Sequence, residues 1–170
     1  MNTPVAISLE QAKEDTFNKS VDGTTCPCCQ QFVKVYRRKI TSSMARALIE
    51  LNRHGIRIGT HTGWTHMPEL LARRKLQRSD EAKLVHWGLM EPFRALRDDG
   101  SKRNGMYRIT YLGHKFVQGA LEVPKYVYIY NHSVQGFSDG TNGHPNETVS
   151  IQECIGEKFN YRELMEMQDD

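Results

Sequence analysis

Three cysteines lie within four positions near the start of the chain, in the stretch TTCPCCQQFVKVYRRKI from residue 24 to residue 40. Zinc is held by deprotonated thiolates or by imidazoles that converge at tetrahedral angles. Cys26 and Cys29 have the separation and the proline of a zinc knuckle, which leaves Cys28 as a spare thiol. The pair predicts two ligands of a metal site.

The other two ligands must come from elsewhere, because the chain contains no second CxxC. His61 and His66 have the spacing of a zinc-finger histidine pair. However, 31 residues separate Cys29 from His61, far more than the usual finger interval of about 12 to 15. The predicted zinc ligands are Cys26, Cys29, His61 and His66, with His54 and Cys154 as further candidates.

Two metal-free interpretations of the cysteines stay open. Cysteine also packs as a small hydrophobic side chain, so a turn with partly buried thiols needs no metal. A catalytic CxxC of the thioredoxin kind usually has its reactive thiol at the start of a helix, whereas this motif precedes a predicted strand. Neighbouring sulfurs pair poorly with one another, so we expect a reducing compartment rather than a disulfide framework.

The composition is that of a soluble globular chain. The 170 residues, 38% of them hydrophobic and 25% charged, suffice for one domain and a small appendage. The first 20 residues lack the apolar segment of a signal peptide, and no run approaches the roughly 18 apolar residues of a membrane span. We therefore expect a cytoplasmic protein with no membrane contact.

Basic residues are concentrated in the middle of the chain. Residues 1–31 contain 2 Lys and Arg against 4 Asp and Glu, residues 32–108 contain 17 against 7, and residues 109–170 contain 4 against 9. The blocks therefore carry net charges of −2, +10 and −5. Because phosphate binding needs clustered cations, the middle block is typical of a nucleic-acid contact. An ordinary solvated surface is the alternative.

Capping residues and apolar periodicity predict four helices and one strand before residue 88. Ser8 can cap the first helix, a thin peripheral arm, and Thr41, Ser42 or Ser43 can cap the second. Pro68 suits the first turn of the third helix, and glycines at 55 and 88 can end two of the helices. The last two helices, joined by a tight polar link, indicate a helix-turn-helix. The helices are expected at 9–17, 41–55, 67–76 and 80–87, and the strand at 31–39.

The segment after residue 88 is predicted to form a β-hairpin with a basic tip. Asp99-Gly100 and Asn104-Gly105 favour tight turns between two extended runs. The second run leads into a helix that Thr110 can cap. The cations of this hairpin are Arg94, Arg97, Lys102 and Arg103.

Residues 41–121 resemble the winged-helix family, most closely small bacterial regulators of the MarR-like kind. In that family a helix ends in a Gly-Leu-Ile/Met-Glu-like step, enters the wing and returns through Tyr-Arg-Leu/Ile-Thr-x-x-Gly to another helix. The corresponding steps here are GLME at 88–91 and YRITYLG at 107–113.

The resemblance implies that the helix at 79–87 faces the DNA major groove and that the wing contacts the backbone or the minor groove. The implied groove residues are Arg78, Ser79 and Lys83, and the implied wing residues are Arg97, Lys102 and Arg103. Asp80 and Glu81 at the start of this helix favour the helix dipole but repel phosphate. A winged-helix scaffold that contacts protein therefore remains an alternative.

The chain after residue 121 lies outside the resemblance. PKYVYIYN alternates as a strand should, and it could extend the wing sheet, line a dimer contact or form a core strand. Turn-forming residues dominate 131–147, where we expect a flexible loop. The last residues suggest a short strand and, after Asn160, an acidic amphipathic helix that docks on its own domain or on a partner.

We therefore expect an α+β protein with a winged helix-turn-helix core at 32–130, a cysteine-rich N-terminal arm at 1–31, a flexible loop at 131–147 and a strand-helix tail at 148–170. The expected function is sequence-specific or general binding of double-stranded DNA, by a homodimer that regulates transcription or another DNA transaction. The predicted DNA-binding residues are Arg73, Arg74, Lys75, Arg78, Ser79, Lys83, Arg94, Arg97, Lys102 and Arg103.

Two other classes of function are the alternatives. The same scaffold can serve a protein-binding adaptor or inhibitor, with the acidic tail and the aromatic strand as its contact surface. We do not expect an enzyme, because the chain lacks the HExxH motif of zinc proteases and the H-x-E…P-C-x-x-C order of zinc deaminases. It also lacks the glycine-rich motifs that bind phosphate. Metal-dependent hydrolysis at a Cys/His site is the enzymatic hypothesis that metal analysis would test.

Overall fold

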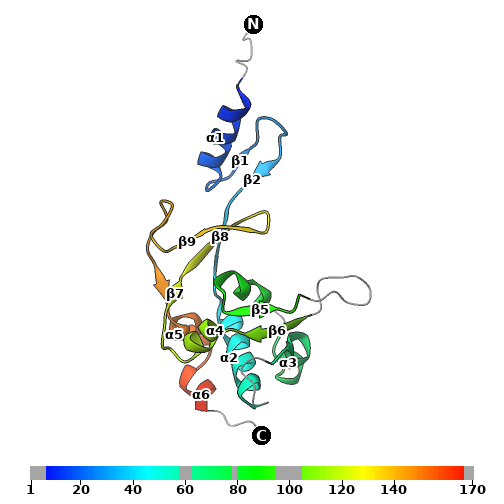
Figure 1. The fold of residues 1–170 in the computed structure, drawn as a ribbon. Helices are drawn as coiled ribbons and strands as arrows, with labels where there is room; N and C mark the ends of the chain where they lie inside the picture. The colour runs from blue at the N-terminus through cyan, green and yellow to red at the C-terminus, as the bar shows by residue number, and fades with distance from the viewer. Residues whose placement is uncertain (1–6, 58–62, 78–79, 95–104, 167–170) are drawn as a thin grey trace, which may run out of the picture.

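The computed structural model describes residues 7–57, 63–77, 80–94 and 105–166 (Figure 1). The fold combines helices with four small antiparallel sheets, so the predicted α+β class is confirmed. Arg78, Ser79, Arg97, Lys102, Arg103 and His61 lie outside the described residues.

An arm formed by the first elements projects from one end of the molecule (Figure 1). Helix α1 (Leu9–Lys19) starts at the predicted cap, because the Ser8 hydroxyl accepts a hydrogen bond from the backbone N–H of Gln11. Strands β1 (Thr24–Thr25) and β2 (Phe32–Val33) form a hairpin with the cysteines in its turn. Ala12 is the one buried residue of α1, which agrees with the thin apolar face expected for it.

The hydrophobic core is centred on helix α2 (Ser42–Arg57). The Thr41 hydroxyl accepts from the backbone N–H of Met44 near its start, as predicted. The helix continues through Gly55, so the predicted end at this glycine is wrong. Gly55 is buried, and packing of α2 outweighs a glycine penalty of about 1 kcal/mol. Side chains less than 2% exposed around α2 include Leu71, Leu84, Phe116 and Ile151.

Two short helices follow α2. Helix α3 (Met67–Arg73) has Pro68 in its first turn, as predicted. The helix expected at 80–87 is a 3₁₀ helix, η1 (Glu81–Trp87), and Gly88 ends it in the left-handed conformation with φ 68°. Trp87 and Leu84 anchor η1 in the core.

A three-stranded antiparallel sheet lies beside these helices. It is formed by β4 (Thr65–His66), β5 (Met90–Pro92) and β6 (Met106–Ile109), in the order β4-β6-β5. The register pairs Met90 with Ile109 and Glu91 with Arg108. The two strands of the predicted hairpin are therefore present, and the tip between them lies outside the described residues. Helix α4 (Tyr111–Val117) follows, capped by Thr110 as expected.

A second three-stranded sheet contains β3 (Tyr36–Lys39), β8 (Tyr126–Tyr130) and β9 (Ser133–Phe137), in the order β3-β8-β9. The strand predicted at 31–39 is therefore two strands, because β2 pairs with β1 whereas β3 pairs with β8. The aromatic strand β8 lies in the middle of this sheet and does not extend the wing sheet.

The flexible loop predicted at 131–147 is wrong for its first part, which forms β9. Asn131 and His132 have φ values of 45° and 63°, and they make the two-residue turn between β8 and β9. A backbone twist with φ above zero at both central residues matches the twist of the flanking strands. The turn-forming residues thus close a hairpin.

The C-terminal residues pack on the core. Strands β7 (Val123–Pro124) and β10 (Thr148–Val149) pair, and helix α5 (Ile151–Ile155), which the sequence prediction missed, starts at a capping box of Ser150 and Glu153. A 3₁₀ helix, η2 (Gly156–Lys158), leads to α6 (Tyr161–Glu166). The Tyr161 hydroxyl donates to the carbonyl oxygen of Val117 at 2.7 Å, so the acidic tail docks on its own domain. Within the described part of the chain, no helix is both long and apolar enough to cross a bilayer.

Candidate nucleic-acid interface

Four cationic residues from two elements line one concavity of about 170 Å³. Strand β3 contributes Arg37, Arg38 and Lys39, and η1 contributes Lys83. The remaining lining residues are Thr41, Met44, Asp80 and Trp87. With four cations and one carboxylate, the concavity carries a formal charge of +3 and favours an anion.

Strand β3 presents its cations because it is an edge strand with all four residues exposed. Two of the cations lie over aromatic rings. The guanidinium carbon of Arg37 is 4.4 Å from the ring centroid of Tyr126. The guanidinium carbon of Arg38 is 5.3 Å from the ring centroid of Tyr36. Among the described residues, no carboxylate forms an ion pair with any of the three β3 cations. Their charge is therefore available to a ligand.

Trp87 ties helix η1 to strand β7. Its indole N–H donates to the carbonyl oxygen of Pro124 at 2.7 Å, and the side chain is 5% exposed. Lys83 forms an ion pair with Asp80, with 2.6 Å between Nζ and Oδ2. Burial, with a smaller contribution from Lys83, lowers the pKa of His86, which keeps this imidazole neutral near pH 7. Glu81 is 5% exposed and does not line the concavity, so Asp80 is the carboxylate that faces a ligand there.

Two of the cations predicted to bind DNA are engaged by carboxylates on α2 and α3. Arg74 lies 3.1 Å from the carboxylate of Glu50, which is fully buried and also contacts Arg46 and Arg53. A buried charge needs such partners, so Arg74 is part of the packing of α2 against α3. Arg73 is exposed and pairs with Glu69, and this guanidinium lowers the pKa of the Glu69 carboxyl.

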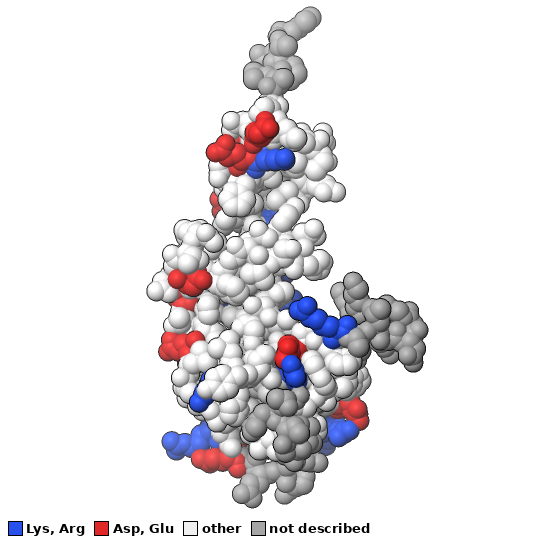
Figure 2. Space-filling model, viewed as in Figure 1, with Lys and Arg blue, Asp and Glu red and all other residues white. Residues whose placement is uncertain are grey.

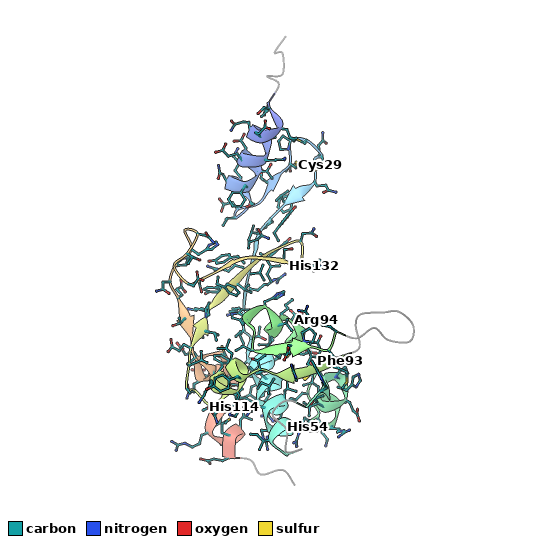
Figure 3. All side chains as sticks on the ribbon, viewed as in Figure 1. Cys29, His54, Phe93, Arg94, His114 and His132 are labelled. Carbon is teal, nitrogen blue, oxygen red and sulfur yellow. The ribbon has the colours of Figure 1, made fainter. Side chains whose placement is uncertain are left out.

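Lys75 and Arg94 are both exposed, at the end of α3 and directly after β5. Figure 3 shows Arg94 beside Phe93 where the chain leaves β5. Phe93 packs edge-on against Trp64 with 4.8 Å between ring centroids, and Arg108 lies over Trp64 and pairs with Glu91. These contacts fix the base of the hairpin.

Cations do not form one continuous patch on the face seen in Figure 2. Lys and Arg side chains there are dispersed, and several have Asp or Glu beside them. The +10 charge of residues 32–108 is thus partly neutralised by local pairs, such as those made by Glu50, Glu69 and Glu91.

Of the four predicted metal ligands, the three in the described part of the chain are not brought together. Cys26 and Cys29 lie in the β1–β2 turn of the arm, whereas His66 is in β4 of the β4-β6-β5 sheet, where its Nδ1 is 3.8 Å from the Glu69 carboxylate. The further candidates are also distant, because His54 lies at the opposite end of the molecule from Cys29 (Figure 3) and Cys154 is buried in α5. In the described ranges, no group of three His, Cys, Asp or Glu side chains is placed to hold a metal ion.

Comparison of the chain with protein-family models, with curated proteins and with solved structures found no match. Its function is therefore argued from its own geometry.

The β3 cations are absent from the predicted DNA-binding residues, although a signal for them exists in the sequence. Residues 37–39 are three consecutive cations at the end of a predicted strand. A strand with cations on both faces has neither face buried, and charged side chains are typical of edge strands. That inference places these charges at the surface, but their position beside η1 depends on the long-range pairing of β3 with β8.

Proposed function

We propose that the protein binds double-stranded DNA and that the concavity between β3 and η1 contacts the phosphate backbone. The observation that carries this proposal is the gathering of Arg37, Arg38, Lys39 and Lys83 around one hollow that contains a single carboxylate. Arginine matches phosphate geometry because its planar guanidinium can donate two parallel hydrogen bonds. We also infer that the protein regulates transcription and that it acts as a homodimer.

The topology supports a winged-helix scaffold. A helix, a strand, two short helices and a two-stranded hairpin follow one another as α2, β4, α3, η1, β5 and β6, and the sheet order is β4-β6-β5. This is the order expected of a winged helix, with η1 as the recognition element and residues 95–104 as the wing. Because one fold can serve many functions, the cations beside η1 carry the functional inference.

The two motifs from which the resemblance came contact each other. The Thr110 hydroxyl of the second motif donates to the carbonyl oxygen of Gly88 in the first motif. The Thr110 backbone N–H donates to the carbonyl oxygen of Leu89, which is also in the first motif. Such contacts explain why both motifs are present in one chain. They support a scaffold in which the wing strands leave directly from the end of η1.

In this arrangement the β3 cations and Lys83 contact phosphates beside η1. Neutralising about three phosphates gives a slope of about −3 in a plot of log affinity against log salt concentration. The test is the affinity for a duplex of about 20 base pairs measured at several salt concentrations. A slope near zero would contradict phosphate contact.

The protein-binding adaptor is less well supported. It depended on the acidic tail and the aromatic strand as a contact surface. Helix α6 packs on its own chain through Leu164, which is 4% exposed, and β8 lies between β3 and β9. A pull-down from nuclease-treated lysate that yields a stoichiometric protein partner would favour the adaptor instead.

A further inference from the structure

The turn that joins β1 to β2 contains Cys26, Cys28 and Cys29, and backbone hydrogen bonds of Cys26 close it. The backbone N–H of Cys26 donates to the carbonyl oxygen of Gln31, and that of Gln30 to the carbonyl oxygen of Cys26, at 2.9 and 2.8 Å. A tight loop of this kind brings the first and last residues of a CxxC to one side.

Gln30 takes the conformation that such a loop needs directly after its second cysteine. Its φ of 59° lies in the left-handed region, which a non-glycine residue adopts at some cost. The hydrogen bonds of Cys26 and the pairs Thr24 with Val33 and Thr25 with Phe32 hold the loop in place. The turn therefore holds Cys26 and Cys29 in one tight loop before any metal is bound.

The described residues of one chain supply only half of a metal site. Zinc in a structural site takes four ligands. In the part of the chain that the structure describes, no third His, Cys, Asp or Glu completes a metal-binding group. Cys28 and Cys29 are exposed and Cys26 is partly exposed, so the sulfurs are open to a second molecule.

The position of the turn suits contact with a second copy of the chain. Figure 3 places Cys29 in the projecting arm, far from His54 and His114, and the arm cysteines line a cavity with Tyr130 and Gln135 of β8 and β9. The arm also has uncovered apolar side chains, and an 11-residue helix with one buried residue is marginal on its own. The exposed apolar side chains of the arm are Ile7, Leu9, Phe17, Val21 and Phe32.

We propose that two copies of this chain share one Zn²⁺ ion, each contributing the sulfurs of Cys26 and Cys29. The four thiols release four protons as four Zn–S bonds of about 2.3 Å form, and no electron is transferred. Cys28 lies between the ligands and does not bind the metal. The shared ion joins the two arms and brings their exposed apolar side chains together, so zinc binding and dimerisation are one event. This site does not depend on DNA binding.

The test is a titration of the reduced chain with zinc, followed by addition of a chelator to remove the metal. We expect about 0.5 zinc ion per chain at saturation. Light scattering should give the mass of a monomer without zinc and of a dimer with it, and the chelator should restore the monomer. Cys26→Ser and Cys29→Ser should each abolish both effects, whereas Cys28→Ser and Cys154→Ser should retain them.

A measurement on the unaltered chain guards against variants that fail to fold. Zinc should protect Cys26 and Cys29 from alkylation at least tenfold more than it protects Cys28, as read by mass spectrometry of the labelled peptides. Three results would overturn the proposal: no zinc bound, one zinc per chain on a monomer, or loss of zinc in Cys28→Ser. A dimer that withstands chelator but dissociates in reductant would indicate a disulfide and would also overturn it.

Discussion

The hydroxyl of Thr110 donates a hydrogen bond of 2.6 Å to the carbonyl oxygen of Gly88. The same hydroxyl accepts a bond of 3.0 Å from the backbone N–H of Gly113 and so caps α4. One side chain thus joins the end of η1, the return of the wing and the start of α4. This corner, formed by Gly88, Thr110 and Gly113, sets the direction in which β5 and β6 leave the helices.

Gly113 should tolerate no side chain, because a Cβ atom there would lie 1.9 Å from the carbonyl oxygen of Leu89. We expect Gly113→Ala to lower the free energy of unfolding by about 3 kcal/mol, through overpacking and displacement of α4. Urea unfolding followed by circular dichroism measures this. Leu112→Ala, at a side chain that is 40% exposed, is the control and should cost less than about 1 kcal/mol. Equal stability of the two variants would show that the corner is not tightly packed.

Arg73 and Arg74 should differ sharply although they are neighbours in the sequence. Arg74→Ala removes a partner of the buried Glu50 carboxylate, and we expect a loss of about 1 to 3 kcal/mol in the free energy of unfolding. Arg73→Ala breaks an exposed pair with Glu69 and should cost less than about 1 kcal/mol. Both values come from urea unfolding at neutral pH. A larger loss for Arg73→Ala would contradict the assignment of Arg74 to the core.

Stability should fall at alkaline pH through Cys154. Burial raises the pKa of this thiol from its ordinary value of 9.0 to about 12. The unfolded chain therefore releases the thiol proton first, so the stabilisation is complete below pH 9 and is lost as the pH rises toward 12, at up to about 1.4 kcal/mol per pH unit. Relative to the unaltered chain, Cys154→Ala should lose less stability between pH 8 and pH 10.5, as measured by urea unfolding. If the free energy of unfolding falls equally with pH in the unaltered chain and in Cys154→Ala, the prediction is wrong. Cys28→Ala serves as the control.

Local signals in the sequence predicted the helix starts well. Ser8, Thr41 and Thr110 each accept a backbone hydrogen bond at a predicted cap, and Gly88 has the positive φ expected of it. These interactions are made within a few residues, so the sequence alone carries them. The spacing of Cys26 and Cys29 likewise predicted the turn in which both lie.

Long-range pairing determined what the sequence could not predict. Residues 31–39 are extended as expected, but the two halves of this run pair with strands at 24–25 and 126–130. Asn131 and His132 are turn formers, and whether they make a loop or a hairpin depends on the pairing of β9 with β8. The position of β3 beside η1 depends on the pairing of β3 with β8, which is why Arg37 and Arg38 are not among the predicted DNA-binding residues.

The wing remains a predicted contact on sequence grounds. Lys102→Ala with Arg103→Ala should weaken binding to all duplex sequences alike and flatten the salt dependence by about one to two units, as loss of phosphate contacts does. Competition titrations with two unrelated duplexes measure both effects. If affinity for both duplexes stays as in the unaltered chain, the wing is not part of the DNA-binding surface.

The most direct test of the proposed function is the salt dependence of duplex affinity for the chain and for Arg37→Ala with Arg38→Ala. A charge-matched control is Lys115→Ala with Arg162→Ala, which removes two cations from α4 and α6. We predict a slope of about −3 or steeper for the unaltered chain and for the control, and a slope shallower by about two units for the β3 variant. An unchanged slope in the β3 variant, or no binding below about 10 μM at low salt, would contradict phosphate contact at the β3–η1 concavity.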